Sequence, residues 1–475
     1  MLSPSAKSAN RFRAPVKRVA ALYLGSLSLL CRPLAGGFPA TANPVTDGVH
    51  KVGLADSRVG YESVSYVTDS KVVIQSLGER QPLYELTANP PLGLPPVTSQ
   101  LDPAEIDLGR ELFFDRRLSK NETLSCAMCH IPEQGFSNNE LKRPIGFEGR
   151  GVKRNAPTLI NVVFNRRLFW DAREDTLAQQ VWAPLLAHNE MNNPSVGAVV
   201  GQLHADPDYA RMFEEAFGEP ADMLNIGQAL AAYQQSLVAG NSRFDRWYYG
   251  GEADALTPQE QRGFALFAGE AGCSGCHLIG ETSALFTDHQ LHNTGVGYAD
   301  SMRKSPDKVR VQLAPGVYGA VDQARVRSVG LPKENDLGRY EVTQAPEDRW
   351  KFRTPSLRNV ALTAPYMHSG EFLALGDVVR FYNQGGVPNE LLTPQIRPLY
   401  LSDSDEAALT AFLGTLTGSD VAALVTDAFA APVGDVSAIE DLGATEDVGL
   451  TGAVGSVRAV RAMEDLGPVR AVGKN

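Results

Sequence analysis

Two copies of the pattern C-x-x-C-H constrain the fold of this chain more than any other feature of its sequence. The paired cysteines are Cys126 with Cys129 and Cys273 with Cys276, followed by His130 and His277. Thiols at this spacing can add to the two vinyl groups of a haem, and the histidine that follows can reach the iron from the same side. We therefore predict two covalently attached haem c groups, with His130 and His277 as iron ligands.

Paired cysteines also occur in zinc sites and in redox-active dithiols. A zinc site needs further ligands and does not require a histidine directly after both pairs. A dithiol needs only one copy of the pattern. The remaining cysteine, Cys31, lies in an N-terminal apolar run, so its removal with that run would leave only the two haem pairs.

The first 42 residues have the order of a secretory signal. Basic residues between positions 7 and 18 precede an apolar run at 19–31, and small residues end at Ala42. Neither this run nor any later one reaches the ~20 apolar residues of a membrane span. We predict cleavage near Ala42 and a periplasmic or otherwise exported protein without an integral span. The alternative is a disordered basic N-terminus on a cytoplasmic protein.

Helical signals surround both motifs. A capping residue, a proline and an early acid occur at 102–105 and again at 257–260, and each set precedes a glycine-led apolar stretch, at 109–114 and 263–268. The repetition indicates an internal duplication. Sustained strand alternation is scarce, and 403–416 has the pattern of a closing helix.

The chain is long enough for more than one core. We expect a mainly α fold with little β structure, built from two c-type cytochrome domains that each surround one covalent haem. The predicted division is a signal peptide at 1–42, an N-terminal extension and Pro-rich linker at 43–97, an N-terminal haem domain at 98–250, a C-terminal haem domain at 251–418, and a low-complexity, disordered tail at 419–475. A net charge of -11 argues against nucleic acid as the main partner.

Residues 86–417 resemble the bacterial di-haem cytochrome c peroxidase and MauG superfamily, and most resemble its MauG-like branch. Besides the haem motifs, the blocks that carry the resemblance are LFFD at 112–115, RNAPTL at 154–159, FWDAR at 169–173, EMNN at 190–193, HNTGVG at 292–297, FRTPSLRNV at 352–360, PYMH at 365–368 and VVRFYN at 378–383. They occur in the order found in the family.

The resemblance implies roles for four residues near the first haem. Trp170 matches a tryptophan that transfers electrons between the haems, although alone it would be read as a core aromatic. Gln180 and Glu190 match polar residues above the peroxide-binding haem, where a carboxylate can accept and return a proton. An isolated glutamate would otherwise be assigned to a solvated helix face. Pro184 falls in the same pocket.

The resemblance also implies a calcium site between the domains. Asn155, Thr363 and Pro365 match its ligands, which are an amide oxygen and backbone carbonyls completed by water. Asparagine beside proline is equally common in turns, so the motif alone leaves both readings open.

The iron ligand on the face opposite the motif histidine distinguishes a catalyst from an electron carrier, because a catalyst needs one open position. Where classical di-haem peroxidases have methionine as the second haem's far ligand, MauG-type enzymes have tyrosine, and this chain has Tyr382. Met367 is the competing ligand, although the family places it beside the calcium segment. Classical peroxidases block the first haem with a histidine near position 146, which here is Gly146. The first haem is therefore expected to be five-coordinate and open to peroxide.

These expectations describe an exported oxidase that uses hydrogen peroxide to reach a high-valent di-haem state. By analogy it would oxidise tryptophan or other aromatic side chains of a partner protein through long-range electron transfer. One alternative is a peroxide-detoxifying cytochrome c peroxidase fed by a small cytochrome or cupredoxin, which would favour methionine at 382. Another is a non-enzymatic electron carrier, which would need protein ligands on both faces of both haems.

Overall fold

The computed structural model describes residues 63–68, 71–76, 79–98, 100–303, 307–314, 317–322, 325 and 335–430. All of them lie in one compact unit, Gly48–Asn475. The predicted signal peptide and its cleavage site fall outside the described residues. Among the helices that are described, none is both long and apolar enough to cross a membrane.

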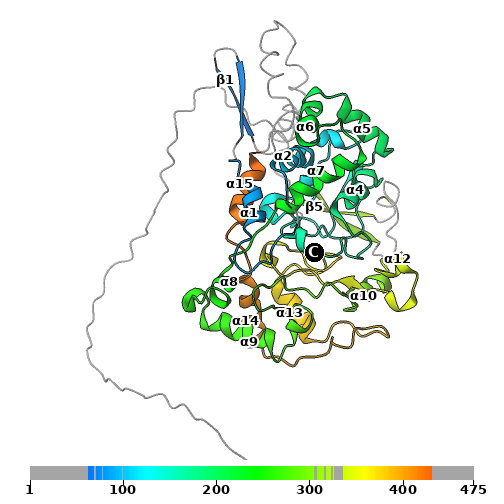
Figure 1. Cartoon of the computed structure of the whole chain (residues 1–475). Coiled ribbons are helices and arrows are strands. Elements are labelled where there is room, and N and C mark those ends of the chain that lie inside the picture. Colours follow the sequence, from blue (N-terminus) through cyan, green and yellow to red (C-terminus); the bar gives the residue numbers. More distant parts are fainter. Residues whose placement is uncertain are drawn as a thin grey trace, which may run out of the picture. The chain divides into compact units, whose positions relative to one another are not determined.

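Helices dominate the described residues (Figure 1), which confirms the prediction of a mainly α chain with little sheet. The α-helices are α1 Leu83–Ala88, α2 Pro103–Phe114, α3 Leu177–Gln180, α4 Trp182–Leu186, α5 Val196–His204, α6 Pro207–Phe217, α7 Met223–Ser236, α8 Arg243–Tyr248, α9 Pro258–Ala268, α10 Val296–Met302, α12 Tyr340–Thr343, α13 Leu375–Asn383, α14 Asp403–Gly414 and α15 Val421–Phe429. Short 3-10 turns join many of them.

The strands of the described residues form two-stranded antiparallel pairs. They are β1 Ser63–Thr68 with β2 Lys71–Ser76, β3 Leu291–His292 with β6 Phe352–Arg353, and β4 Lys308–Ala314 with β5 Val317–Asp322. The β3–β6 pair joins two family blocks that are distant in sequence, with His292 opposite Phe352.

The predicted caps begin α2 and α9. The Asp102 carboxylate accepts a hydrogen bond from the Ala104 backbone N–H (2.8 Å), and Thr257 and Glu260 form a reciprocal capping box. Both caps satisfy backbone donors that the first helical turn leaves free, and a proline follows each cap at the first helical position.

The duplicated glycines place two helix pairs in close contact. A Cβ on Gly109 of α2 would lie 1.8 Å from the Ala229 carbonyl oxygen of α7, and one on Gly263 of α9 would lie 2.0 Å from the Ala408 carbonyl oxygen of α14. Only glycine permits either approach. The duplication seen in the sequence is therefore repeated in the packing, as an α2–α7 pair and an α9–α14 pair.

Each pair belongs to its own hydrophobic core. The first core includes Leu108, Phe113 and Tyr233 and packs against Cys126. The second includes Phe267 and Phe412 and packs against Cys273. Phe244 of α8 lies within the predicted N-terminal haem domain in sequence, yet it packs in the second core.

The C-terminal tail begins later than predicted. Residues 421–429, which the composition assigned to a disordered tail, form α15, and Leu424 and Ala428 are buried in the first core. Asp427 of α15 forms a buried ion pair with Arg110 of α2 (3.0 Å). The prediction of a disordered tail from residue 419 was wrong for α15 because the residue that pairs with Asp427, Arg110, is distant in sequence. Residues 431–475 lie outside the described part.

The Pro-rich segment also differs from the linker that we predicted. Leu83 of α1 is buried in the first core, whereas the Gly93 carbonyl accepts hydrogen bonds from the Arg358 guanidinium and the Ala284 N–H. The stretch from α1 to the Pro-rich segment therefore packs against both cores, since Leu83 lies in the first and the Gly93 carbonyl accepts a hydrogen bond from Ala284 of the second.

Candidate active site

Each C-x-x-C-H motif folds as a short turn that directs its side chains to one cavity. The turns are η2 Cys126–Met128 and η7 Cys273–Gly275. In both, the histidine backbone N–H donates to the carbonyl of the first cysteine, at 2.9 Å. The shared hydrogen bond gives the two motifs the same local geometry.

Hydrogen bonds also orient the two histidine rings. His130 Nδ1 lies 3.2 Å from the Phe136 carbonyl oxygen and His277 Nδ1 lies 2.8 Å from the Phe286 carbonyl oxygen. A carbonyl accepts a hydrogen bond from a protonated Nδ1, which leaves Nε2 as the metal-ligating atom. Burial lowers the pKa of both rings, and the neutral ring is the form that binds a metal.

The first cavity lies beside the first motif and has an empty volume of about 1920 Å³. His130 and both motif cysteines line it. The other side chains that the sequence predicted for this site also line it: Trp170, Gln180, Pro184 and Glu190. They come from α3, α4 and the loops that flank them, so the structure brings the predicted set together.

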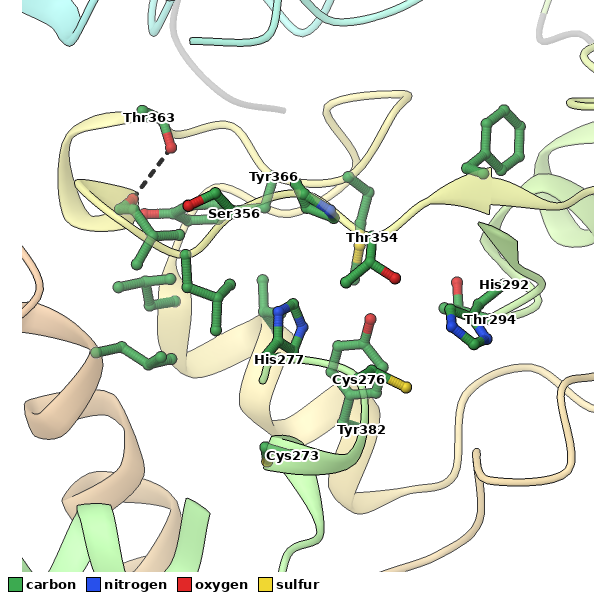
Figure 2. A pocket seen from close by; sticks show the side chains of 18 of the residues that line it. Cys273, Cys276, His277, His292, Thr294, Thr354, Ser356, Thr363, Tyr366 and Tyr382 are labelled. Atoms are coloured by element: carbon green, nitrogen blue, oxygen red, sulfur yellow. Dashed lines mark hydrogen bonds between the residues drawn. The ribbon is translucent and has the colours of Figure 1, made fainter. Parts of the chain in front are cut away.

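The second cavity lies beside the second motif and has an empty volume of about 2000 Å³. Figure 2 shows Cys273, Cys276, His277 and Tyr382 around it. Tyr382 lies on α13, and apolar side chains such as Leu357, Val379 and Leu409 complete the walls. Large, mainly apolar cavities with few polar groups are typical of cofactor sites.

The residues present fit a haem in each cavity. All four motif cysteines are free thiols, and burial raises the pKa of the Cys126 and Cys129 thiols to about 12 and of the Cys273 thiol to about 11. Neutral, unpaired thiols beside a cavity and a histidine whose Nδ1 is held by a backbone carbonyl are the groups that haem c attachment uses.

The sequence profile described as di-haem cytochrome c peroxidase matches residues 103–253. The methylamine utilization protein MauG of Methylorubrum extorquens is 35% identical over 331 residues, which cover 69% of this chain and 82% of the relative. The chain belongs to the di-haem cytochrome c peroxidase and MauG family. The family identifies the protein as a peroxidase-type oxidoreductase and implies two haem cofactors.

The chain is similar both to a protein named as a peroxidase and to one named as MauG-like. The cytochrome-c peroxidase IdrP2 of Denitromonas iodatirespirans is 36% identical over 319 residues, covering 66% of this chain and 81% of the relative. The solved structure of a MauG-like protein associated with microbial copper homeostasis matches with a TM-score of 0.58 and 32% identity, covering 72% of this chain and 97% of that chain.

In the lining of the first cavity, Gly146 packs directly against the loop that carries Glu190. A Cβ at position 146 would lie 2.2 Å from the Asn189 carbonyl oxygen and 2.8 Å from the Glu190 Cα. A histidine at this position would therefore require the Glu190 loop to move. The absence of a ligating side chain at Gly146 and the position of Glu190 depend on one another.

Burial raises the pKa of Glu190, and the positive charge of Arg173 opposes that shift. Both side chains line the first cavity. A carboxyl group with a raised pKa holds its proton closer to neutral pH and can both give and accept one. Glu190 is thus equipped for the proton transfer that the sequence assigned to it.

Two candidate ligands reach the second cavity. Tyr382 and Met367 both line it. The pKa of Tyr382 is raised, first by burial and then by the adjacent Cys273 and Cys276, which places the phenol close to the haem attachment turn. Met367 lies instead in the loop between Pro365 and His368.

Trp170 lies in the wall that separates the two cavities and lines both. Its indole N–H donates to the Asn155 backbone carbonyl (2.9 Å), and its own carbonyl accepts from the Arg353 N–H (2.8 Å). These bonds hold Trp170 in the lining of both cavities, and its role in electron transfer stays a prediction.

The three predicted calcium ligands lie around the second cavity. Asn155, Thr363 and Pro365 all line it. The Asn155 amide nitrogen donates to the Lys142 carbonyl (3.2 Å), so its Oδ1 is the atom available for a cation. These neutral oxygens suit Ca²⁺, provided that water completes the coordination shell.

Sequence reasoning assigned no role to two buried side chains of these walls. Arg353 lines both cavities, and His368, whose Nε2 has no hydrogen-bond partner in the described structure, lines the second. Both occur in the quoted family blocks, but only the fold shows that a charged side chain in β6 reaches the shared wall.

Proposed function

We propose that this chain is an exported di-haem oxidase of the MauG type that uses hydrogen peroxide to oxidise aromatic side chains of a partner protein. Each C-x-x-C-H motif would hold one haem covalently, within the two domains predicted from the sequence. Haem iron, when bound, supplies peroxide activation and one-electron transfer. The position of Tyr382 beside the second haem attachment turn is the observation that carries the proposal.

Around the first cavity, the chain's own groups can manage protons. Glu190 accepts a proton from the entering peroxide and returns it to the leaving oxygen, while Gln180 orients the substrate by hydrogen bonding. Pro184 shapes the pocket. Gly146 has no side chain that could bind iron, so a haem in this cavity would be open to peroxide without a prior reductive step.

Around the second cavity, Tyr382 would supply a hard oxygen ligand in place of a thioether, and this oxygen would become anionic when the phenol loses its proton to bind ferric iron. Such a ligand favours ferric over ferrous iron and therefore lowers the reduction potential. Trp170 connects the two cavities through their common wall. Asn155, Thr363 and Pro365 would hold calcium beside it, which would fix the relative positions of the two sides.

If the two haems store oxidising equivalents, we expect the substrate to be a partner protein and not a small redox protein that donates electrons. The MauG relative and the MauG-like neighbour associated with copper homeostasis support this choice, and proteins that handle copper are the first partners to test. A peroxide-detoxifying enzyme fed by a small redox protein is the second candidate, because IdrP2 is equally similar in sequence.

The experiment records optical and EPR spectra of the ferric holoprotein before and after one equivalent of hydrogen peroxide. We expect one high-spin and one low-spin haem, and a long-lived oxidised spectrum without prior reduction. Two low-spin haems that respond only after half-reduction would contradict the MauG-type proposal and favour the peroxidase. Two that never respond would indicate an electron carrier.

The matched variants are Tyr382→Met and Tyr366→Met. Both tyrosines line the second cavity, but only Tyr382 is proposed to bind iron. We expect Tyr382→Met to raise the potential of the second haem and to shorten the life of the oxidised spectrum, because a thioether replaces phenolate. Tyr366→Met should leave the low-spin EPR signal unchanged. If both substitutions change the potential and the oxidised spectrum equally, Tyr382 is not the iron ligand.

A further inference from the structure

Arg353 is a buried cation without an anionic partner among the described residues. Its side chain is 7% exposed. Its Nη1 donates to the Asn165 side-chain oxygen (3.2 Å) and its Nε to the Phe169 carbonyl (3.4 Å). Both acceptors are neutral. A guanidinium has five N–H donors, so most of its capacity is not used by these two bonds.

Other arginines of the described chain that are buried or nearly buried are paired with acids. Arg110 pairs with Asp427, Arg154 with Asp336 and Arg358 with Asp245. Burial lowers the pKa of Arg353 to about 10 with no acid to counter it. Removing a charge from water costs several kcal/mol unless a counter-charge compensates it. The described residues therefore supply no counter-charge to Arg353, and a bound anion would supply one.

The open surroundings of Arg353 are the two cavities, because its side chain contributes to the wall of both. The group proposed to occupy each cavity brings its own anions, since every haem carries two carboxylate side chains. A planar guanidinium binds a carboxylate through two parallel hydrogen bonds. Charge and geometry are thus complementary at this wall.

We propose that Arg353 binds a carboxylate of haem at the wall shared by the two cavities. The ion pair fixes the edge of that haem and compensates the buried charge. The inference rests on the proposed presence of haem in both cavities, and it assigns to Arg353 a binding role that the motif pattern does not contain.

The ion pair also affects the neighbouring tryptophan. Because the Arg353 N–H donates to the Trp170 carbonyl and its Nε to the preceding carbonyl, the positive charge lies next to the residue proposed to transfer electrons. An uncompensated cation would oppose loss of an electron from the indole by simple Coulomb repulsion. A carboxylate on Arg353 removes that obstacle.

The test measures the midpoint potentials of both haems in the holoprotein by spectroscopic redox titration without peroxide. In Arg353→Gln we expect the potential of one haem to fall by roughly 59 mV, which is a tenfold change for a one-electron couple, because the lost cation favoured the reduced state. The haem that shifts is the one whose carboxylate is bound. Arg353→Lys keeps the charge and should recover at least half of the shift.

Arg211→Gln is the matched control, because Arg211 lies exposed on α6 and lines neither cavity. Its potentials should remain at those of the parent protein. Unchanged potentials in Arg353→Gln, or the same shift in Arg211→Gln, would overturn the proposal. If Arg353→Gln does not fold, Arg353→Met removes the charge in its place, and unchanged potentials in that variant would overturn the proposal. Since no peroxide is used, this result is independent of whether the protein reacts as a MauG-type oxidase.

Discussion

The two cavities are alike at the haem attachment motif and differ in the other side chains that line them. Both histidines direct Nδ1 to a backbone carbonyl, and both cores rest on a glycine that brings two helices together. Gly146 and the acid Glu190 also line the first cavity, whereas Tyr382 lines the second. The two halves thus share the haem attachment geometry and the helix packing, and the cavities differ in the side chains proposed to meet peroxide or to bind iron.

The largest expected effect is on the rate of reaction with hydrogen peroxide when Glu190, which lines only the first cavity, is replaced. In Glu190→Gln the amide cannot accept the peroxide proton, so we expect the second-order rate constant with hydrogen peroxide to fall by about 10²–10⁴-fold. Stopped-flow absorbance measures it. The low-spin spectrum of the second haem should be unchanged, since Glu190 lines only the first cavity.

Glu148→Gln is the control for this variant, because the Glu148 carboxylate pairs with Arg150 at the surface. It should react at the rate of the parent. The parent's rate should also rise with pH through a pKa above the ordinary glutamate value, since burial raises the pKa of Glu190 and only the carboxylate accepts a proton. A Glu190→Gln protein that keeps the rate and this pH limb would exclude Glu190 as the base.

The next effect tests whether the two cores are equivalent. Gly109→Ala and Gly263→Ala each force a Cβ into a carbonyl oxygen of the partner helix, and overpacking of this kind costs about 1–3 kcal/mol. We expect similar decreases in the denaturation midpoint for both. A loss in only one variant would show that the duplicated contact stabilises one core alone.

Gly201→Ala serves as the matched control for these substitutions. Gly201 lies in α5, where an added Cβ meets nothing within 4 Å. Alanine is favoured over glycine in a helix by about 1 kcal/mol, so this variant should be slightly more stable than the parent. If Gly201→Ala is also destabilising, the losses in Gly109→Ala and Gly263→Ala cannot be assigned to the two helix contacts.

The sequence predicted what local patterns determine. Caps and periodic apolar residues located α2, α9 and α14, and the histidine after each cysteine pair located both cavities. The partner of Arg110 could not be found in this way, because Asp427 lies in an Ala- and Val-rich stretch with no motif. The setting of Arg353 was also hidden, since a charged residue in a short strand is normally exposed and only tertiary packing places it in the shared wall.

The smallest effect concerns a charge that only one copy of the duplicated helix carries. Glu111 of α2 corresponds in the repeat to Ala265 of α9. Burial raises the pKa of Glu111 to about 7, while Arg80 and Arg110 partly offset the shift. Because the folded pKa lies above the unfolded one, the stabilising contribution is complete below pH 4.5 and is lost as pH rises through 7.

Glu111→Gln should therefore gain stability relative to the parent protein between pH 5 and pH 8. A pKa unit corresponds to about 1.4 kcal/mol, and because the Arg80 pair at the surface relieves part of the cost, we expect a relative gain on the order of 1 kcal/mol. Denaturation midpoints at the two pH values measure it, with Glu214→Gln on the exposed face of α6 as control. If Glu111→Gln follows the parent at both pH values, the first core carries no ionisation that the second lacks, and the two cores differ only at their cavities.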